Sequence, residues 1–179
     1  GKNNIENIST AEDVRYTLKC LNNIGIISYR KNNNIIIHGG TFINPNQALF
    51  CGNSGTTMRL LSGLLVGLNI NAELLGDESL LKRPMDRIIK PLKMMGANIS
   101  SKGGKAPILI KKTDTLKDLK YSMDVVSAQV KSALLFAGVA SNKQVQISEK
   151  YKSRDHTEIM LNDMGYDVKS AFEYEFFLF

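Results

Sequence analysis

Apolar and polar residues follow one another along this chain in an arrangement that occurs three times. Each copy has apolar residues at helical spacing, then a glycine, then the alternating positions typical of a strand hairpin. The helical stretches are residues 12–24, 83–95 and 154–164, and the glycines that follow them are Gly25, Gly96 and Gly165. These glycines lie 71 and 69 residues apart, which predicts a structural repeat of about that length.

Each repeat glycine stands just after the last helical turn, where the backbone adopts a positive φ that glycine accepts without strain. The middle helix is amphipathic, and Pro84 fits its first turn. Its apolar face consists of Met85, Ile88, Ile89, Leu92 and Met95, and its polar face of Asp86, Arg87, Lys90 and Lys93.

A second kind of helix is expected at residues 55–66 and 128–137, ending at Gly67 and Gly138. Past the first turn, both stretches are apolar or small on nearly every side. A helix with no polar face is usually buried all round, so we expect both helices inside the domain. The side chains expected to line the centre are Leu60, Leu64, Leu134 and Leu135.

The first repeat has no helix of this second kind, because Gly1 stands roughly where Gly67 and Gly138 stand in the later repeats. We expect that a helix has been lost before Gly1 and that its loss leaves a gap beside the central leucines. Strands are expected at residues 34–38, 70–74, 108–110 and 145–147. The prediction is an α/β fold in a single domain, residues 1–179, with units at about 1–45, 46–115 and 116–179, the first incomplete.

Composition and charge narrow the class of protein. The chain is 43% apolar and 22% charged, which is ordinary for a soluble globular protein. Its longest apolar stretches, such as residues 133–140, are far shorter than a membrane span of roughly 20 residues, so no membrane partner is expected. The net charge of +6 favours an anionic partner. Because the basic residues are scattered and aromatics are sparse, small anionic ligands are favoured over nucleic acid.

The positions of the cysteines and histidines do not indicate a metal site. Cys20, Cys51, His38 and His156 have no metal-ligand spacing, so we expect no metal site. Two cysteines in a chain of 179 residues favour a reducing compartment, and hence the cytoplasm. His156 has no apparent Ser, Cys or Asp partner for proton transfer.

The starts of the two apolar helices are candidate anion sites. Residues 51–59 bring Gly, Ser and Thr to a helix start, whose free N–H groups and partial positive charge suit phosphate or carboxylate. No P-loop motif is present, and a plain capped helix remains the alternative. Ser127, Ala128 and Gln129 open the second helix, where Ser127 could equally be only an N-cap. If the repeats are related by rotation, both starts face the same end of the domain.

Two arginines stand at the starts of the amphipathic helices, Arg83 in the middle repeat and Arg154 in the last. The guanidinium group grips phosphate and carboxylate with two parallel hydrogen bonds. An arginine at a helix start is also a common surface residue, so these positions alone do not decide between binding and solvation.

Four motifs carry a resemblance to a known family. They are residues 49–63 (LFCGNSGTTMRLLSG), 76–85 (GDESLLKRPM), 127–133 (SAQVKSA) and 153–158 (SRDHTE). In this order and register they resemble the signatures of the EPSP synthases, a family of enolpyruvyl transferases. The resemblance covers about residues 5–168.

The resemblance implies two lobes, each of three βαβαββ units, with substrates in the cleft between them; this chain is expected to be part of one lobe. It also implies transfer of the enolpyruvyl group of phosphoenolpyruvate to the 5-hydroxyl of 3-phosphoshikimate, with loss of phosphate and without metal or organic cofactor. By motif, the shikimate 3-phosphate would contact Ser127, Ala128 through its backbone, Gln129, Ser153 and Arg154. Phosphoenolpyruvate, and glyphosate in competition, would contact Gly55, Arg83 and Gln129, with Thr56 and Arg59 in support.

The chain departs from the family pattern in three ways. The Lys-Ser-x-x-x-Arg segment that grips both substrates belongs on the missing first helix. The second lobe, with its proton-transfer Asp, Glu and Lys, is absent, so we assign no catalytic residue here and expect no activity from this chain alone. Residues 171–179 alternate like a strand and do not resemble the family.

Two other functions remain as alternatives. A UDP-N-acetylglucosamine enolpyruvyl transferase would have a similar fold, but it requires a reactive cysteine in an arginine-rich loop, and Cys51 is in a different motif. A non-catalytic anion or nucleic-acid module is indicated only by the charge. If the transferase interpretation holds, one open, electropositive concavity should be lined by Gly55, Arg83, Ser127, Gln129 and Arg154.

Overall fold

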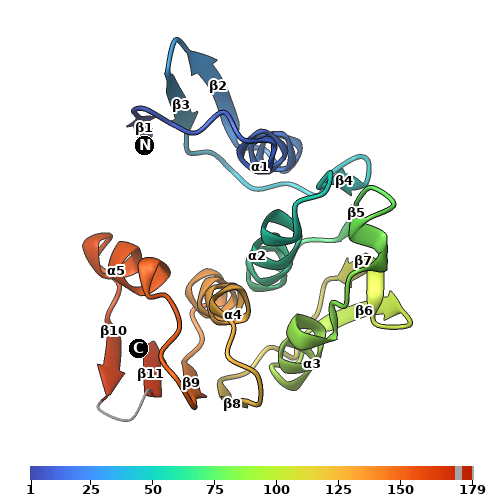
Figure 1. The fold of residues 1–179 in the computed structure, drawn as a ribbon, viewed down its shortest axis with the longest axis vertical. Helices are drawn as coiled ribbons and strands as arrows, with labels where there is room; N and C mark the ends of the chain where they lie inside the picture. Colours follow the sequence, from blue (N-terminus) through green and yellow to red (C-terminus); the bar gives the residue numbers. More distant parts are fainter. Residues whose placement is uncertain (172–174, 179) are drawn as a thin grey trace.

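Three β-sheets lie around two neighbouring helices in the computed structural model, which describes residues 1–171 and 175–178 (Figure 1). The first sheet holds β1 (Lys2–Ile5), β2 (Ile27–Lys31) and β3 (Asn34–His38). The second holds β4 (Leu49–Phe50), β5 (Ala72–Leu75), β6 (Asn98–Lys102) and β7 (Lys105–Lys111). The third holds β8 (Leu119–Met123), β9 (Val145–Glu149), β10 (Val168–Ala171) and β11 (Glu175–Leu178). Each sheet is thus built from one stretch of the chain.

The second and third sheets share one topology. The helices are α1 (Glu12–Asn23), α2 (Gly55–Gly67), α3 (Asp86–Met94), α4 (Ala128–Ser141) and α5 (His156–Asp163), with a 3₁₀ turn at Leu80–Lys82. Both sheets come from a βαβαββ segment, with strand orders β4-β5-β7-β6 and β8-β9-β11-β10. In each, the first two strands are parallel and the other neighbours antiparallel.

The first sheet is a shorter version of the same plan. Its order is β1-β3-β2 with antiparallel neighbours, and α1 joins β1 to β2. The described chain therefore begins with a βαββ unit, and the predicted α/β fold with repeated βαβαββ units and a shorter first unit is confirmed. The extent of the single domain and its unit boundaries near residues 45 and 115 stay predictions.

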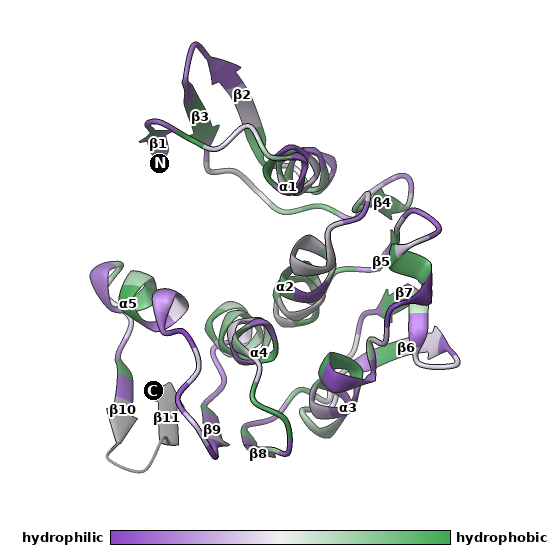
Figure 2. Ribbon diagram, viewed as in Figure 1, coloured by the Kyte–Doolittle hydropathy of each residue, from purple (hydrophilic) through white to green (hydrophobic). Residues whose placement is uncertain are grey.

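Helices α2 and α4 lie at the centre and pack closely against each other (Figure 1). Gly63 and Gly67 permit this close contact, since a Cβ atom added at either would collide with the backbone of Ala133 or Ala137, respectively. Figure 2 colours fewer residues of these two helices as hydrophilic than in α1 and α3. The predicted burial of these two helices is therefore confirmed for most of their length.

The prediction of a gap beside the central leucines is wrong for two of the four. Leu134 and Leu135 are both 0% exposed, because they belong to the buried hydrophobic core. Leu60 and Leu64 are only half-buried, and Leu64 still packs against that core.

The repeat glycines behave as predicted. Gly25, Gly96 and Gly165 follow the ends of α1, α3 and α5 with φ angles of 97°, 92° and 90°. At Gly96 a side chain would also collide with the carbonyl of Thr115, so both backbone conformation and space require glycine there.

Two predicted helix boundaries are wrong. Pro84 does not occupy the first turn of α3: it forms a β-bridge with Lys105, and the helix begins at Asp86. Helix α4 does not end at Gly138 but continues to Ser141, and Asn142 closes it with φ 53°. The side chain of Asn tolerates this left-handed conformation, so glycine is not needed at the end.

The end of the chain takes part in the third sheet. Residues 175–178 form β11, which pairs with both β9 and β10, so the strand expected in this segment is confirmed for them; residues 172–174 and 179 lie outside the described part. Among the described helices, none is both long and apolar enough to span a membrane.

Candidate functional site

The two central helices begin with the same local structure. Ser54 precedes α2 and accepts a hydrogen bond from the N–H of Thr57 at 3.1 Å. Ser127 precedes α4 and accepts one from the N–H of Val130 at 3.4 Å. Both serines are N-caps, as the alternative interpretation of Ser127 allowed. The N–H groups of the first turn that the cap leaves free still carry partial positive charge.

A hydrogen-bond chain joins these two helix starts. Gln129 on α4 accepts from Arg59 Nη1 at 2.8 Å and donates through Nε2 to the hydroxyl of Thr56 at 2.8 Å. Arg59 and Thr56 both lie on α2, and Arg59 Nη2 also donates to the carbonyl of Pro84 at 3.2 Å. Residues about 70 positions apart are therefore held in one cluster by side-chain contacts.

Arg83 reaches the same cluster from the segment before α3. Its Nη2 donates to Asn53 Oδ1 at 2.6 Å, and the side chain is exposed. A Cβ atom at Gly55 would lie 2.7 Å from Arg59 Nη1 and 3.4 Å from Arg83 Nη1. The absence of a side chain at Gly55 thus lets both guanidinium groups approach the start of α2.

The cluster is electropositive. Burial, and then repulsion from Arg83 and Arg87, lowers the pKa of Arg59. Within the described part of the chain, none of these three arginines forms an ion pair with a carboxylate. Three cations with helix N–H groups beside them form a surface that suits an anion.

Ser153 and Arg154 lie in the segment between β9 and α5. The N–H of Ser153 donates to Glu149 Oε1 at 2.8 Å, whereas its hydroxyl is buried with no hydrogen-bond partner among the described residues. Arg154 is exposed, and Asp155 pairs with Lys152 instead. In the described structure, no hydrogen bond joins Ser153 or Arg154 to the Arg59–Gln129 cluster.

The structure therefore brings together five of the candidate residues directly: Gly55, Thr56, Arg59, Arg83 and Gln129. Ser127 and Ala128 directly precede Gln129 at the start of α4, and both are half-buried. The binding of substrate by these residues, and by Ser153 and Arg154, stays a prediction.

Three contacts were missed by the sequence analysis. Asn53 holds Arg83, and the carbonyl of Pro84 holds Arg59, but neither has a sequence signal beyond its motif. Lys131 forms a buried ion-pair cluster with Glu149 and Glu158. A lysine in an otherwise apolar helix was a usable signal for this cluster, because a buried charge requires a partner.

The surroundings of Cys51 do not suit a reactive cysteine. Cys51 is 0% exposed, and the hydrogen bond in which its thiol donates to Cys20, together with burial, raises the pKa of that thiol. A thiol of raised pKa is a poor nucleophile, which argues against the alternative that requires a reactive cysteine. Among the described residues, no group of three or more His, Cys, Asp and Glu side chains is placed to hold a metal ion.

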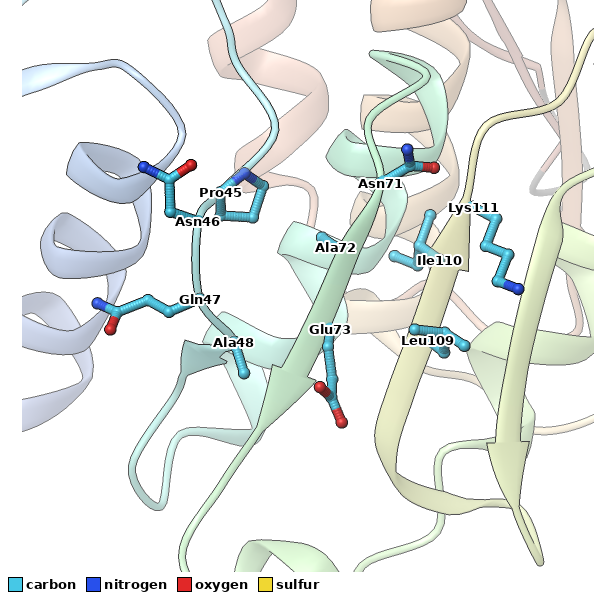
Figure 3. A pocket seen from close by; sticks show the side chains of 10 residues that line it. All are labelled: Pro45, Asn46, Gln47, Ala48, Asn71, Ala72, Glu73, Leu109, Ile110 and Lys111. Carbon is cyan, nitrogen blue, oxygen red and sulfur yellow. The ribbon is translucent and has the colours of Figure 1, made fainter.

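One surface hollow lies away from the cluster. A cavity of about 410 Å³ is bounded by residues 45–48 and strands β5 and β7, and Figure 3 shows the carboxylate of Glu73 and the ammonium of Lys111 among its side chains. It contains one cation and one anion, so it lacks the excess positive charge that an anion site requires.

Comparison with known proteins gives consistent matches. The family model described as EPSP synthase (3-phosphoshikimate 1-carboxyvinyltransferase) matches residues 1–177. The expectation that residues 171–179 do not resemble the family is thus wrong for most of that segment.

Individual relatives agree with the family match. A 3-phosphoshikimate 1-carboxyvinyltransferase of Legionella pneumophila (strain Corby) is 46% identical over 173 residues, which cover 94% of this chain and 40% of the relative. One of Salinibacter ruber is 44% identical over 167 residues, covering 90% and 39%. A solved EPSP synthase from Acinetobacter baumannii matches with a TM-score of 0.94 and 40% identity, covering 99% of this chain and 41% of that one. The chain spans about 40% of the length of these relatives.

Proposed function

The chain belongs to the EPSP synthase family, and from this premise we propose that it supplies part of the substrate site of a 3-phosphoshikimate 1-carboxyvinyltransferase. The proposed reaction transfers the enolpyruvyl group of phosphoenolpyruvate to the 5-hydroxyl of 3-phosphoshikimate and releases phosphate. The proposed partners are these two small anionic substrates and a second lobe of the same enzyme. Nucleic acid and membranes are not among them.

One observation carries this proposal. Arg59, Arg83 and Gln129 meet over the start of α2, and neither arginine has a carboxylate partner among the described residues. Three elements far apart in the sequence thus place donors around one point. Such an arrangement is costly in electrostatic repulsion unless an anion binds there.

We assign the residues by motif and geometry. Phosphoenolpyruvate would be held by Gly55, Arg83 and Gln129, and Thr56 and Arg59 would keep Gln129 in place through the hydrogen bonds described above. The 3-phosphate of 3-phosphoshikimate would be held by Ser127, Ala128, Gln129, Ser153 and Arg154.

These groups suit an addition and elimination reaction. Protonation at the methylene carbon of phosphoenolpyruvate and attack by the 5-hydroxyl, which gives up its proton, form a tetrahedral intermediate. Phosphate then leaves while the new methyl group loses a proton, which restores the double bond. Charge changes around the carboxylate and phosphate of the bound substrate, and donors fixed in advance stabilise that change without reorganising. We assign no proton-transfer group to this chain, and we propose that such groups lie in the remainder of the enzyme.

The proposed compartment is the cytoplasm. Cys20 and Cys51 are both free and buried, as is usual for a protein from a reducing compartment.

The experiment that tests the function is a chimera. The matched segment of the Legionella pneumophila relative is replaced by this chain, and phosphate release from phosphoenolpyruvate and 3-phosphoshikimate is measured. We expect turnover from the chimera, a loss of about tenfold or more in kcat/KM with Arg83→Ala, and none from the 179-residue chain alone. Turnover that is unchanged by Arg83→Ala, or substantial turnover by the chain alone, would contradict the assignment.

A further inference from the structure

A lysine and two glutamates form a buried cluster behind the start of α4. Lys131 Nζ lies 3.1 Å from Glu149 Oε1 and 2.6 Å from Glu158 Oε1. The side chains of Lys131 and Glu149 are 0% exposed, and that of Glu158 is 7% exposed. Charges this deeply buried hold one another in place, because separating them would leave a charge without solvent or partner.

The cluster connects three parts of the third repeat. Lys131 lies on α4, Glu149 ends β9 and Glu158 lies on α5. The backbone N–H of Lys131 donates to the carbonyl of Ser127 at 3.0 Å, so the lysine belongs to the turn that begins at the N-cap of α4.

One oxygen of Glu149 receives contacts from both sides of the proposed phosphate site. Glu149 Oε1 accepts from Lys131 Nζ and from the backbone N–H of Ser153, while Oε2 has no hydrogen-bond partner in the described part of the chain. A single carboxylate oxygen thus joins α4 to the segment that carries Ser153 and Arg154.

This link matters because no helix or strand ladder holds the backbone of the segment. Residues 150–155 lie outside helices and strands, and the side chain of Arg154 is exposed without a hydrogen-bond partner among the described residues. A hydrogen bond from a backbone N–H to a charged acceptor is stronger than a neutral one, so it fixes the backbone directly beside Arg154.

We propose that Lys131 and Glu149 are positioning residues that set the distance between the start of α4 and the Ser153–Arg154 segment. Through this distance they determine the affinity for the phosphate group of 3-phosphoshikimate, without touching the substrate. The inference rests on the proposed function, because it takes these two elements as the two sides of one phosphate site.

Glu158 offers a matched control. It is buried and pairs with the same lysine, but no hydrogen bond joins it to Ser153 in the described structure. After Glu149→Met or Glu158→Met, Lys131 keeps one carboxylate partner, so both variants leave a neutral ion pair. In both, methionine replaces a glutamate of similar size. Helix α5 also keeps a second link to α4, the hydrogen bond of 2.6 Å between the hydroxyls of Thr157 and Ser132.

The two variants are compared in the Legionella chimera by steady-state kinetics and thermal unfolding. We expect Glu149→Met to raise KM for 3-phosphoshikimate about tenfold and KM for phosphoenolpyruvate less than about twofold, since a small misplacement of a binding group is enough for such a loss. We expect Glu158→Met to change both KM values less than about twofold, with a similar shift of the melting temperature.

Equal effects of the two variants on KM for 3-phosphoshikimate, or equal effects of Glu149→Met on the two substrates, would overturn the positioning role and leave a purely structural one. If Glu149→Met prevents folding, Ser153→Pro removes the same N–H from the loop side and is expected to raise this KM well above that of Ser153→Ala, which loses the hydroxyl but keeps the N–H; equal KM values for the two variants would overturn the positioning role. An unaltered chimera that neither binds nor converts 3-phosphoshikimate would instead refute the proposed function itself.

Discussion

Helices α2 and α4 hold equivalent places in successive repeats, but the surroundings of their first basic residues differ. Arg59 on α2 is half-buried and points its donors to uncharged acceptors at the surface cluster. Lys131 on α4 is fully buried and lies against two carboxylates. The same framework therefore leaves one cation available to a ligand and neutralises the other inside the protein.

The difference has a physical origin in the neighbouring elements. Glu149 and Glu158 come from β9 and α5, which pack against α4 within its own repeat. Around Arg59 the neighbours supply Gln129, Pro84 and two further arginines instead. Arg59 is the fifth residue after its N-cap and Lys131 the fourth, so the two side chains leave their helices on different faces, and the side chains next to each face determine the role of the cation.

The strongest test of this contrast removes each cation in turn. Lys131→Met leaves two buried carboxylates without their cation and should lower the free energy of unfolding by about 3–5 kcal/mol. Arg59→Met removes hydrogen bonds to neutral groups and relieves repulsion from Arg83, so it should change that free energy by about 1 kcal/mol or less. Urea denaturation of the 179-residue chain measures both; similar losses would remove the contrast.

The next test concerns ligand binding at the α2 side. Arg83→Ala should weaken the binding of phosphoenolpyruvate to the chimera by about 1.5–3 kcal/mol, because it removes a charged donor. Lys82→Ala, which removes an adjacent exposed cation outside the cluster, should cost much less. Isothermal titration calorimetry separates the two, and equal losses would indicate only a general charge effect.

The close crossing of the two helices can be tested with one methyl group. Gly63→Ala should destabilise the chain by about 1–3 kcal/mol, because the new Cβ collides with the backbone of Ala133. At an exposed helical site the same change is stabilising by about 1 kcal/mol. A melting temperature that rises with Gly63→Ala would show that α2 and α4 are further apart than described.

The smallest expected effect distinguishes the two N-caps. Ser54 is buried and accepts from both the N–H and the hydroxyl of Thr57, whereas Ser127 is half-buried with one longer hydrogen bond. Ser54→Ala should therefore cost about 1–2 kcal/mol of stability, and Ser127→Ala about 0.5–1 kcal/mol. Chemical denaturation of both variants measures the two losses of stability. A larger loss for Ser127→Ala than for Ser54→Ala would contradict the prediction.

Several features of the fold could be predicted because they depend on neighbouring residues. The helical spacing that ends at Gly25, Gly96 and Gly165 located three helix ends, since only the local backbone decides where a positive φ is needed. The same reasoning failed at Pro84, which satisfies the rule for a first helical turn but is held in a β-bridge with Lys105. It also failed at the end of α4, where Asn142 replaces glycine.

The sequence by itself determined the repeat, the classes of helix, the motifs of the EPSP synthase family and the residue types able to hold an anion. These follow from periodicity and from the local preferences of each residue, which need no knowledge of the fold. Only the tertiary structure decided that Arg59 meets Gln129 across 70 residues and that Lys131 is shared by Glu149 and Glu158. Such pairings depend on how helices and sheets pack, and packing brings together groups that no local pattern relates.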